Sequence, residues 1–214
     1  MIPILYQDSR CIVVDKPRGM MVHRGTQPCE DSEVLLQSLR DQTGLKIFVV
    51  HRLDRPTSGI ILLALDPAAE AELRGQFEHR RTGKTYLAVC RGDPGESGLI
   101  DNLMSGRDNE PDRLVRCVTA WKRLALADEG KLALVEVTPE TGRFHQIRRH
   151  FAGLGHPLLG DWLYGDHELN QTWEERGVAR LMLHALSLSF FHPDDQRPIH
   201  LSASWPEEFL RFQT

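Results

Sequence analysis

"HRLDRPTSGIILLALDP", residues 51–67, combines the segment that decides the fold with a charged loop directly before it. Its second half, "IILLALD" at 60–66, is a continuous apolar run of strand length, which predicts a strand buried on both faces. Asp66 and Pro67 then supply a good N-cap and first residue for a helix over "DPAAEAELRGQFEHR". A covered strand followed at once by a helix indicates a mixed α and β architecture.

Outward from this stretch, the pattern is strand-rich with a few helices. Strands are expected at 11–17, 84–91, 118–126, 132–138, 186–191 and 199–204, and helices at 32–44, about 145–154 and in the C-terminal "PEEFLRF". Residues 92–113, "GDPGESGLIDNLMSGRDNEPDR", are rich in glycine, proline and acids, which predicts a long loop or insertion. We expect one α+β domain over residues 1–214.

Composition places the chain among soluble globular proteins, with 41% hydrophobic and 26% charged residues. There is no apolar run of about 18 residues, and the N-terminus "MIPILYQDSR" carries an acid and an arginine where a signal peptide needs apolar residues. The four cysteines form no C-x-x-C pair, so neither a zinc ribbon nor a disulfide framework is indicated. A cytoplasmic location is expected.

The charge distribution is uneven although the net charge is only -4. That total argues against a protein that coats nucleic acid by bulk electrostatics. Between residues 74 and 91, however, five cations face only Glu78, and residues 143–156 contain no acid. Local basic surfaces suit selective binding of a polyanion, and the alternative is a solvated charged face.

Asp54 stands between Arg52 and Arg55, just before the predicted buried strand. Pro56 and Gly59 indicate a tight, irregular backbone, and a loop anchored by a strand is a common carrier of a catalytic group. The two arginines would favour the ionised carboxylate, which is a poor general acid and a serviceable nucleophile. The alternative is a structural Arg–Asp pair that braces a turn.

The segment "TGRFHQIRRHFAGLGHP", residues 141–157, predicts a turn into a helix on which His145 and Arg148 share one face. Arg149 is expected about a hundred degrees away around that helix. Arginine suits both carboxylate pairing and phosphate binding, and no acid competes for it within this segment.

Two further predictions concern single residue types. The histidines at 145, 150 and 156 have spacings of five and six, which do not suit a metal site on one helix face. Tyr86 is expected on the strand face opposite Leu87, either filling the core or stacking on a base of single-stranded nucleic acid. The motifs of P-loop, dinucleotide-binding and α/β-hydrolase proteins do not occur.

Taken in order, these segments resemble the pseudouridine synthases of the RluA family. The matching stretches are "VVDKPRGMMVHRG" (13–25), "HRLDRPTSGI" (51–60), "GKTYLAV" (83–89), "TGRFHQIRRH" (141–150), "GHPLLGD" (155–161) and "RLMLHALSLSF" (180–190). The stretches "HRLDRPTSG", "HQIRRH" and "VHRG" are most similar to the subgroup of tRNA pseudouridine-65 synthases, which modify the acceptor-stem side of tRNA. A shorter chain and a partial match at "GDWLYGD" separate this sequence from that subgroup.

The resemblance implies a cofactor-free isomerase that converts a uridine of folded RNA to pseudouridine. It makes Asp54 the essential catalytic acid, attacking either the uracil ring or the anomeric carbon, with Tyr86 against the target base and Arg148 paired to Asp54. The uridine would be flipped out, with Arg52 in or near the vacated stack. Arg55 would contact phosphate or brace the loop. Further RNA-binding residues would be Arg143, His145 and Arg149.

The implied fold is a mixed, mainly antiparallel sheet with flanking helices and a central RNA-binding cleft, without an N-terminal S4-type module. We expect a monomer that binds structured RNA, tRNA first, and no membrane. The alternatives are a synthase directed to ribosomal RNA or of dual specificity, a non-catalytic RNA-binding module, and a metal-dependent hydrolase that uses the histidines.

Overall fold

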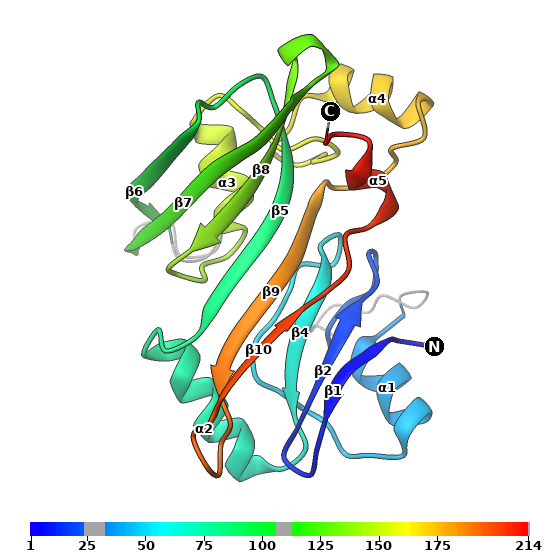
Figure 1. Ribbon diagram of the computed structural model, residues 1–214, viewed down its shortest axis with the longest axis vertical. Helices are drawn as coiled ribbons and strands as arrows, with labels where there is room; N and C mark the ends of the chain where they lie inside the picture. Colours follow the sequence, from blue (N-terminus) through cyan, green and yellow to red (C-terminus); the bar gives the residue numbers. More distant parts are fainter. Residues whose placement is uncertain (24–32, 106–112, 214) are drawn as a thin grey trace. The chain divides into compact units, whose positions relative to one another are not determined.

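The predicted buried strand is β4 (Ser58–Ala64), and all seven of its residues are buried. It belongs to a computed structural model that describes residues 1–23, 33–105 and 113–213 (Figure 1). The chain divides into two compact units. The first consists of Met1–Gly83 and Ala185–Ser204, and the second of Lys84–His184 and Trp205–Thr214.

The first unit is built on a mixed sheet around β4. Its strands are β1 (Ile4–Gln7), β2 (Cys11–Lys16), β3 (Phe48–Val49), β4, most of β9 (Leu183–Phe191) and β10 (Pro198–Ser202). They run in the order β1-β2-β4-β9, while β3 also pairs with β4 and β10 with β9. Two helices belong to this unit, α1 (Leu35–Thr43) and α2 (Pro67–Glu78). Asp66 caps α2 as predicted, because its carboxylate accepts hydrogen bonds from the backbone N–H groups of Ala68 and Ala69.

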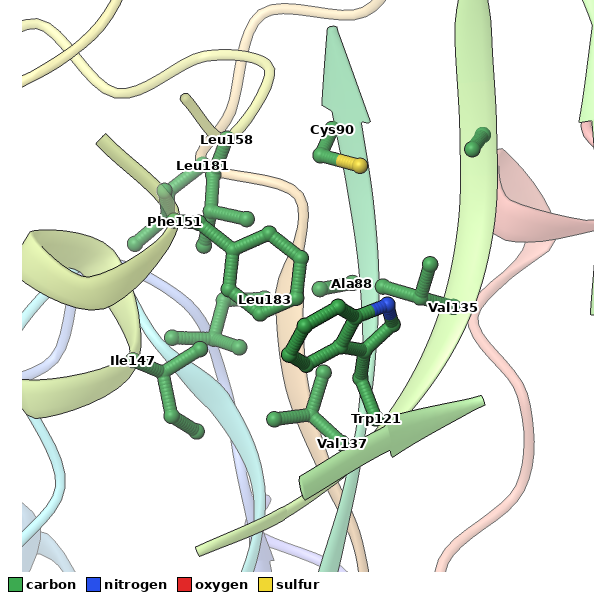
Figure 2. Close-up of a cluster of buried hydrophobic side chains, with 11 residues drawn as sticks. Ala88, Cys90, Trp121, Val135, Val137, Ile147, Phe151, Leu158, Leu181 and Leu183 are labelled. Carbon is green, nitrogen blue, oxygen red and sulfur yellow. The ribbon is translucent and has the colours of Figure 1, made fainter. Parts of the chain in front are cut away.

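Within the second unit, the strands run in the order β5-β8-β7-β6, and each pair of neighbours is antiparallel. Its strands are β5 (Gly83–Arg91), β6 (Ser97–Ser105), β7 (Leu114–Ala127) and β8 (Leu132–Pro139), and its helices are α3 (Gln146–Gly153), α4 (His167–Glu175), α5 (Glu207–Leu210) and the 3-10 turn η1 (Asp128–Gly130). The core of this unit lies between α3 and the sheet. Figure 2 shows Phe151 of α3 facing Trp121 of β7, and the two ring centroids are 6.0 Å apart.

The α+β class, the mixed, mainly antiparallel sheet and the flanking helices are therefore confirmed. The prediction for 92–113 was wrong in part, because residues 97–105 form β6 and pair with β7 over nine positions. Residues 106–112 lie outside the described part of the chain. Helix α4 was not predicted at all.

None of the helices within residues 1–23, 33–105 and 113–213 combines the length and apolar character needed to cross a membrane. The three cysteines in these ranges, Cys11, Cys90 and Cys117, are buried and form no disulfide. Burial is the main reason that the pKa values of Cys11 and Cys90 rise to about 12. The fourth, Cys29, lies outside the described residues.

Candidate active site

The loop that carries Asp54 is held by a lysine from the neighbouring strand. Lys16, the last residue of β2, has no exposed surface. Its ammonium donates hydrogen bonds to the carbonyl oxygens of Pro17 at 2.9 Å, Met20 at 2.9 Å and Arg55 at 3.3 Å. A buried ammonium needs such partners, and here they fix the backbone immediately after Asp54.

Backbone and side-chain contacts complete this loop. The amide of Gly19 donates to the Arg55 carbonyl at 2.9 Å, and Arg55 Nε donates in return to the Gly19 carbonyl at 3.0 Å. The amide of Thr57 donates to the Asp54 carbonyl at 3.1 Å, which closes a turn. Asp54 itself is half-buried and Arg52 is exposed. Arg55 therefore braces the loop, which was one of its two predicted roles.

His51 and Gly59 fix the two ends of the loop. His51 Nε2 accepts a hydrogen bond from the Leu62 amide at 3.1 Å, and its ring stacks on Phe77 at a centroid distance of 4.3 Å. Gly59 has a φ of +110°, and a Cβ there would lie 2.2 Å from the Ala185 carbonyl oxygen. Only glycine fits this approach of β4 to β9.

In the second unit, the start of α3 is organised by a buried glutamine. Gln146 Oε1 accepts hydrogen bonds from the Thr141 hydroxyl at 2.6 Å and the Arg143 amide at 3.1 Å. Its Nε2 donates to the Val118 carbonyl and the Thr119 hydroxyl, both at 2.9 Å. The turn from β8 into α3 is thereby attached to β7.

Arg148 is engaged by an acid to which the sequence motifs assigned no role. Its Nε donates to Asp161 Oδ2 at 2.7 Å and its Nη2 to Asp161 Oδ1 at 2.9 Å. The two side chains are 7% and 0% exposed, so this is a buried, bidentate ion pair. The segment 141–157 contains no acid, and the partner of Arg148 follows four residues after it.

Burial by itself raises the pKa of Asp161, but its hydrogen bonds outweigh that effect. The Arg148 guanidinium and the amides of Leu163 and Tyr164 hold this pKa below the usual range of an aspartate. Asp161 therefore keeps its negative charge at neutral pH and balances the buried cation.

Tyr164 contacts two of the predicted residues, His145 and Arg148. Its hydroxyl lies 3.1 Å from His145 Nδ1, and its ring lies 5.2 Å from the Arg148 guanidinium carbon. His145 adopts a left-handed backbone conformation with φ 50°, and its ring stacks on Phe144 at 3.7 Å. Because α3 begins at Gln146, the expectation that His145 and Arg148 share a helix face was wrong, although both side chains contact Tyr164.

The remaining predicted cations differ in exposure. Arg143 is exposed. Arg149 is half-buried and donates from Nη1 to the Ser105 carbonyl and from Nη2 to the Ser105 hydroxyl, both at 2.9 Å. Within the basic run 74–91, Arg74 pairs with Glu70 and Arg91 with Asp166. Part of that predicted basic surface is therefore neutralised internally.

The three histidines have separate hydrogen-bond partners. His145 contacts Tyr164, His150 lies between Thr119 and Asn102, and His156 contacts the Arg91 carbonyl. Burial, and after it the nearby Arg149 cation, lowers the pKa of His150 to about 4. Across the described ranges, no three His, Cys, Asp or Glu residues form a group that could hold a metal ion.

Tyr86 lies in β5 opposite Val137 of β8. It is half-buried and packs against the hydrophobic cluster of Figure 2, on the face that also carries Ala88, whereas Leu87 on the opposite face is fully buried. The predicted alternation is confirmed. The ring fills the edge of the core and retains partial exposure, so both predicted roles of this tyrosine fit its position.

Comparison with known proteins gives consistent matches over nearly the whole chain. Residues 10–153 match the family model described as RNA pseudouridylate synthase. A protein named tRNA pseudouridine synthase C from Vibrio cholerae is 40% identical and is aligned over 97% of this chain and 92% of its own length. The protein of the same name from Haemophilus ducreyi is 39% identical over 98% and 95%.

A third protein of that name, from Pectobacterium carotovorum, is 38% identical over 96% of this chain, which spans only 59% of that relative. Among solved structures, human RNA pseudouridylate synthase domain containing 1 has a TM-score of 0.79 at 26% identity, covering 99% of this chain and 86% of its own. Human RNA pseudouridylate synthase domain containing 4 has a TM-score of 0.75 at 28% identity, with coverages of 98% and 90%.

Proposed function

This chain belongs to the RNA pseudouridylate synthase family, and on that premise we propose that it isomerises a uridine of a transfer RNA to pseudouridine. The resemblance to the RluA family that the sequence motifs indicated is confirmed. In the reaction, the bond between the ribose and the uracil nitrogen breaks, the uracil rotates while bound, and a bond to its C5 forms. The C5 proton is released to solvent, which gives the reaction a direct readout.

The observation that carries the assignment of the catalytic residue is the way the Asp54 loop is held. A fully buried ammonium, Lys16, fixes the backbone beside Asp54, and Arg55 and Gly19 join the loop to the segment after β2. A loop whose backbone is fixed in this way needs little reorganisation during the reaction. Asp54 would act either at the uracil ring or at the anomeric carbon of the ribose.

Tyr86 and Arg148 are proposed to serve the same reaction from the second unit. Tyr86 would pack against the target uracil, for which its partly exposed ring is suited. Arg148, which is already paired with Asp161, would in addition orient the Asp54 carboxylate. These roles rest on family membership and on the surroundings of each residue within its own unit.

The proposed RNA contacts differ in kind. Arg52 and Arg143 are exposed, so their guanidinium groups can meet phosphates or the space left by a flipped uridine. Arg149 and Arg55 already hold neighbouring backbone and would act on RNA through the shape of that backbone. His145, stacked on Phe144, is proposed to contact a base or sugar.

Transfer RNA is the proposed substrate because relatives that align over nearly their full length carry the name tRNA pseudouridine synthase C. The subgroup resemblance of the sequence adds the acceptor-stem side as the position. The single catalytic domain over 1–214, the RNA-binding cleft, the monomeric state and the cytoplasmic location stay predictions.

The test is tritium release from RNA that carries 5-tritiated uridine. Unmodified tRNA and ribosomal RNA are offered in parallel to the wild type and to Asp54→Ala. We expect release from tRNA by the wild type, and a rate for Asp54→Ala lower by a factor on the order of 10⁴ or more, with tRNA binding retained. Release from ribosomal RNA alone would mean that the substrate is ribosomal RNA and not tRNA. More than trace activity of Asp54→Ala would contradict the catalytic role.

A further inference from the structure

The carboxylate of Asp161 collects four N–H donors in the buried interior of the second unit. Oδ2 accepts from Arg148 Nε, and Oδ1 accepts from Arg148 Nη2 and from the amides of Leu163 and Tyr164 at 3.0 and 3.1 Å. Such a group is charged and fixed at the same time, since each oxygen is bound in a defined direction.

The backbone of Asp161 is fixed independently of its side chain. The Asp161 carbonyl accepts a hydrogen bond from Asn170 Nδ2 at 3.0 Å, and Asn170 Oδ1 accepts from the Gly160 amide at 2.7 Å. Asn170 is a buried residue of α4, 2% exposed, so this helix anchors the segment from which Asp161 reaches Arg148. The burial of the polar Asn170 side chain is explained by this role.

These contacts determine the orientation of the Arg148 guanidinium. Two of its three nitrogens, Nε and Nη2, meet Asp161, and the Tyr164 ring lies 5.2 Å from its central carbon. A planar group bound along one edge cannot rotate, and its other edge, which includes Nη1, points in one direction only. Without Asp161, the same side chain would be a buried cation lacking its counter-charge.

We propose that Asp161 is a positioning residue of the isomerisation, which sets the plane of the Arg148 guanidinium for its work on the catalytic acid. The inference rests on the proposed function and adds to it a residue that acts only through Arg148. It gives the segment 160–164, and Asn170 that anchors it, a part in the reaction, although neither carries a reacting group.

Asp161→Asn is the discriminating substitution. The amide oxygen can still accept from Leu163 and Tyr164 and so retain the turn, whereas an NH₂ group replaces Oδ2 and opposes the N–H of Arg148 Nε. We expect kcat for tritium release from tRNA to fall about 100-fold while KM changes by less than about threefold, as for a misplaced catalytic group.

Asp166→Asn is the matched control. Asp166 caps α4 at the Leu169 amide and pairs with Arg91, a contact that is half exposed. The substitution has the same change of charge in the same segment, and we expect its kcat to stay within about threefold of wild type.

A double-mutant cycle with Arg148→Lys separates positioning from mere support of the fold. If Asp161 acts through Arg148, the double variant should be no more than about threefold slower than the slower single variant. A loss in the double variant equal to the product of the two single losses would show an independent, structural role and overturn the proposal. Wild-type kcat in a folded Asp161→Asn protein would also overturn it.

If Asp161→Asn does not fold, Asp161→Glu replaces it in the test, because a glutamate keeps the negative charge of the ion pair. The longer side chain displaces the carboxylate by one methylene, so we expect a folded protein with kcat lower by about tenfold, and unchanged kcat would overturn the positioning role. The activity of the wild type distinguishes failure of the proposed function from failure of the positioning role. An inactive wild type overturns the proposed function and this role with it, whereas an active wild type beside fully active Asp161 variants overturns this role alone.

Discussion

The loop around Asp54 and the helix start around Arg148 are fixed in opposite ways. Around Asp54, the contacts act on backbone carbonyls and amides, supplied by Lys16 and Gly19. Around Arg148, they act on the guanidinium itself, which is held by the buried carboxylate of Asp161. Fixing a backbone leaves the direction of the side chain to other partners, whereas fixing a side chain determines its chemistry directly. Substitutions that remove the backbone support around Asp54 should therefore have different effects from substitutions that remove the side-chain support around Arg148.

Lys16→Met should have the largest effect on the Asp54 loop. The thioether fills most of the volume but removes the hydrogen bonds of the buried ammonium to three carbonyls, which should lower the free energy of unfolding by about 4 kcal/mol and also reduce kcat. Denaturant unfolding and tritium release measure the two effects. Lys46→Met, an exposed lysine of the same unit, is the control and should change stability by less than about 0.5 kcal/mol. Equal stability of the two variants would show that the loop does not depend on Lys16.

His150, in the same helix as Arg148, should make the free energy of unfolding depend on pH. Its pKa is about 4 in the folded protein against an ordinary value of 6.5, so between these values the unfolded chain binds a proton that the folded protein does not. The free energy of unfolding should therefore fall as the pH is lowered from 6.5 to 4, by about 3 kcal/mol in all, and this contribution should level off below pH 4.

Urea unfolding of wild type and His150→Gln across this range measures that contribution. The glutamine variant should show a smaller loss of stability over the same range. Identical slopes for the two proteins would mean that His150 is protonated as easily in the folded protein as in the unfolded chain.

Arg143 and Arg149 should give the smallest effects, of two different kinds. The exposed Arg143 is expected to bind phosphate, so Arg143→Gln should weaken tRNA binding a few-fold and reduce the slope of log affinity against log salt by about 1. Arg149→Gln loses two hydrogen bonds to Ser105 and should lower the free energy of unfolding by about 1 kcal/mol instead. Titrations at several salt concentrations, with unfolding curves, distinguish them. A salt slope that changes only for Arg149 would reverse the assignment.

Much of the fold was predictable because the signals were local. The apolar run at 60–66, the cap at Asp66 and the alternation around Tyr86 each describe a few consecutive residues, and the structure confirms all three. Strand β6 was missed because its outward leucines, Leu99 and Leu103, are exposed and interrupt the expected alternation. Gly98 also looked like a loop residue, but a Cβ there would meet the Trp121 ring at 2.1 Å.

The candidate site was predictable as motifs but not as contacts. Asp54, Arg148 and Tyr86 stand in recognisable stretches, whereas Asp161 is thirteen residues from Arg148 and its pairing depends on how the chain returns after α3. Lys16 was quoted within a motif without a role. A lysine at the end of the apolar run "CIVVDK" was the available signal, since a cation there must be either exposed or fully bound.

The buried thiols have a practical consequence for studying the two units separately. Cys11 lies in the first unit, and Cys90 and Cys117 lie in the second. Because alkylating reagents attack the thiolate and need access to it, each of these sulfurs reacts only while the structure around it is open. The order in which mass spectrometry finds them modified then ranks the opening of the units. The protein thus carries its own chemical labels for local unfolding, without any engineered cysteine.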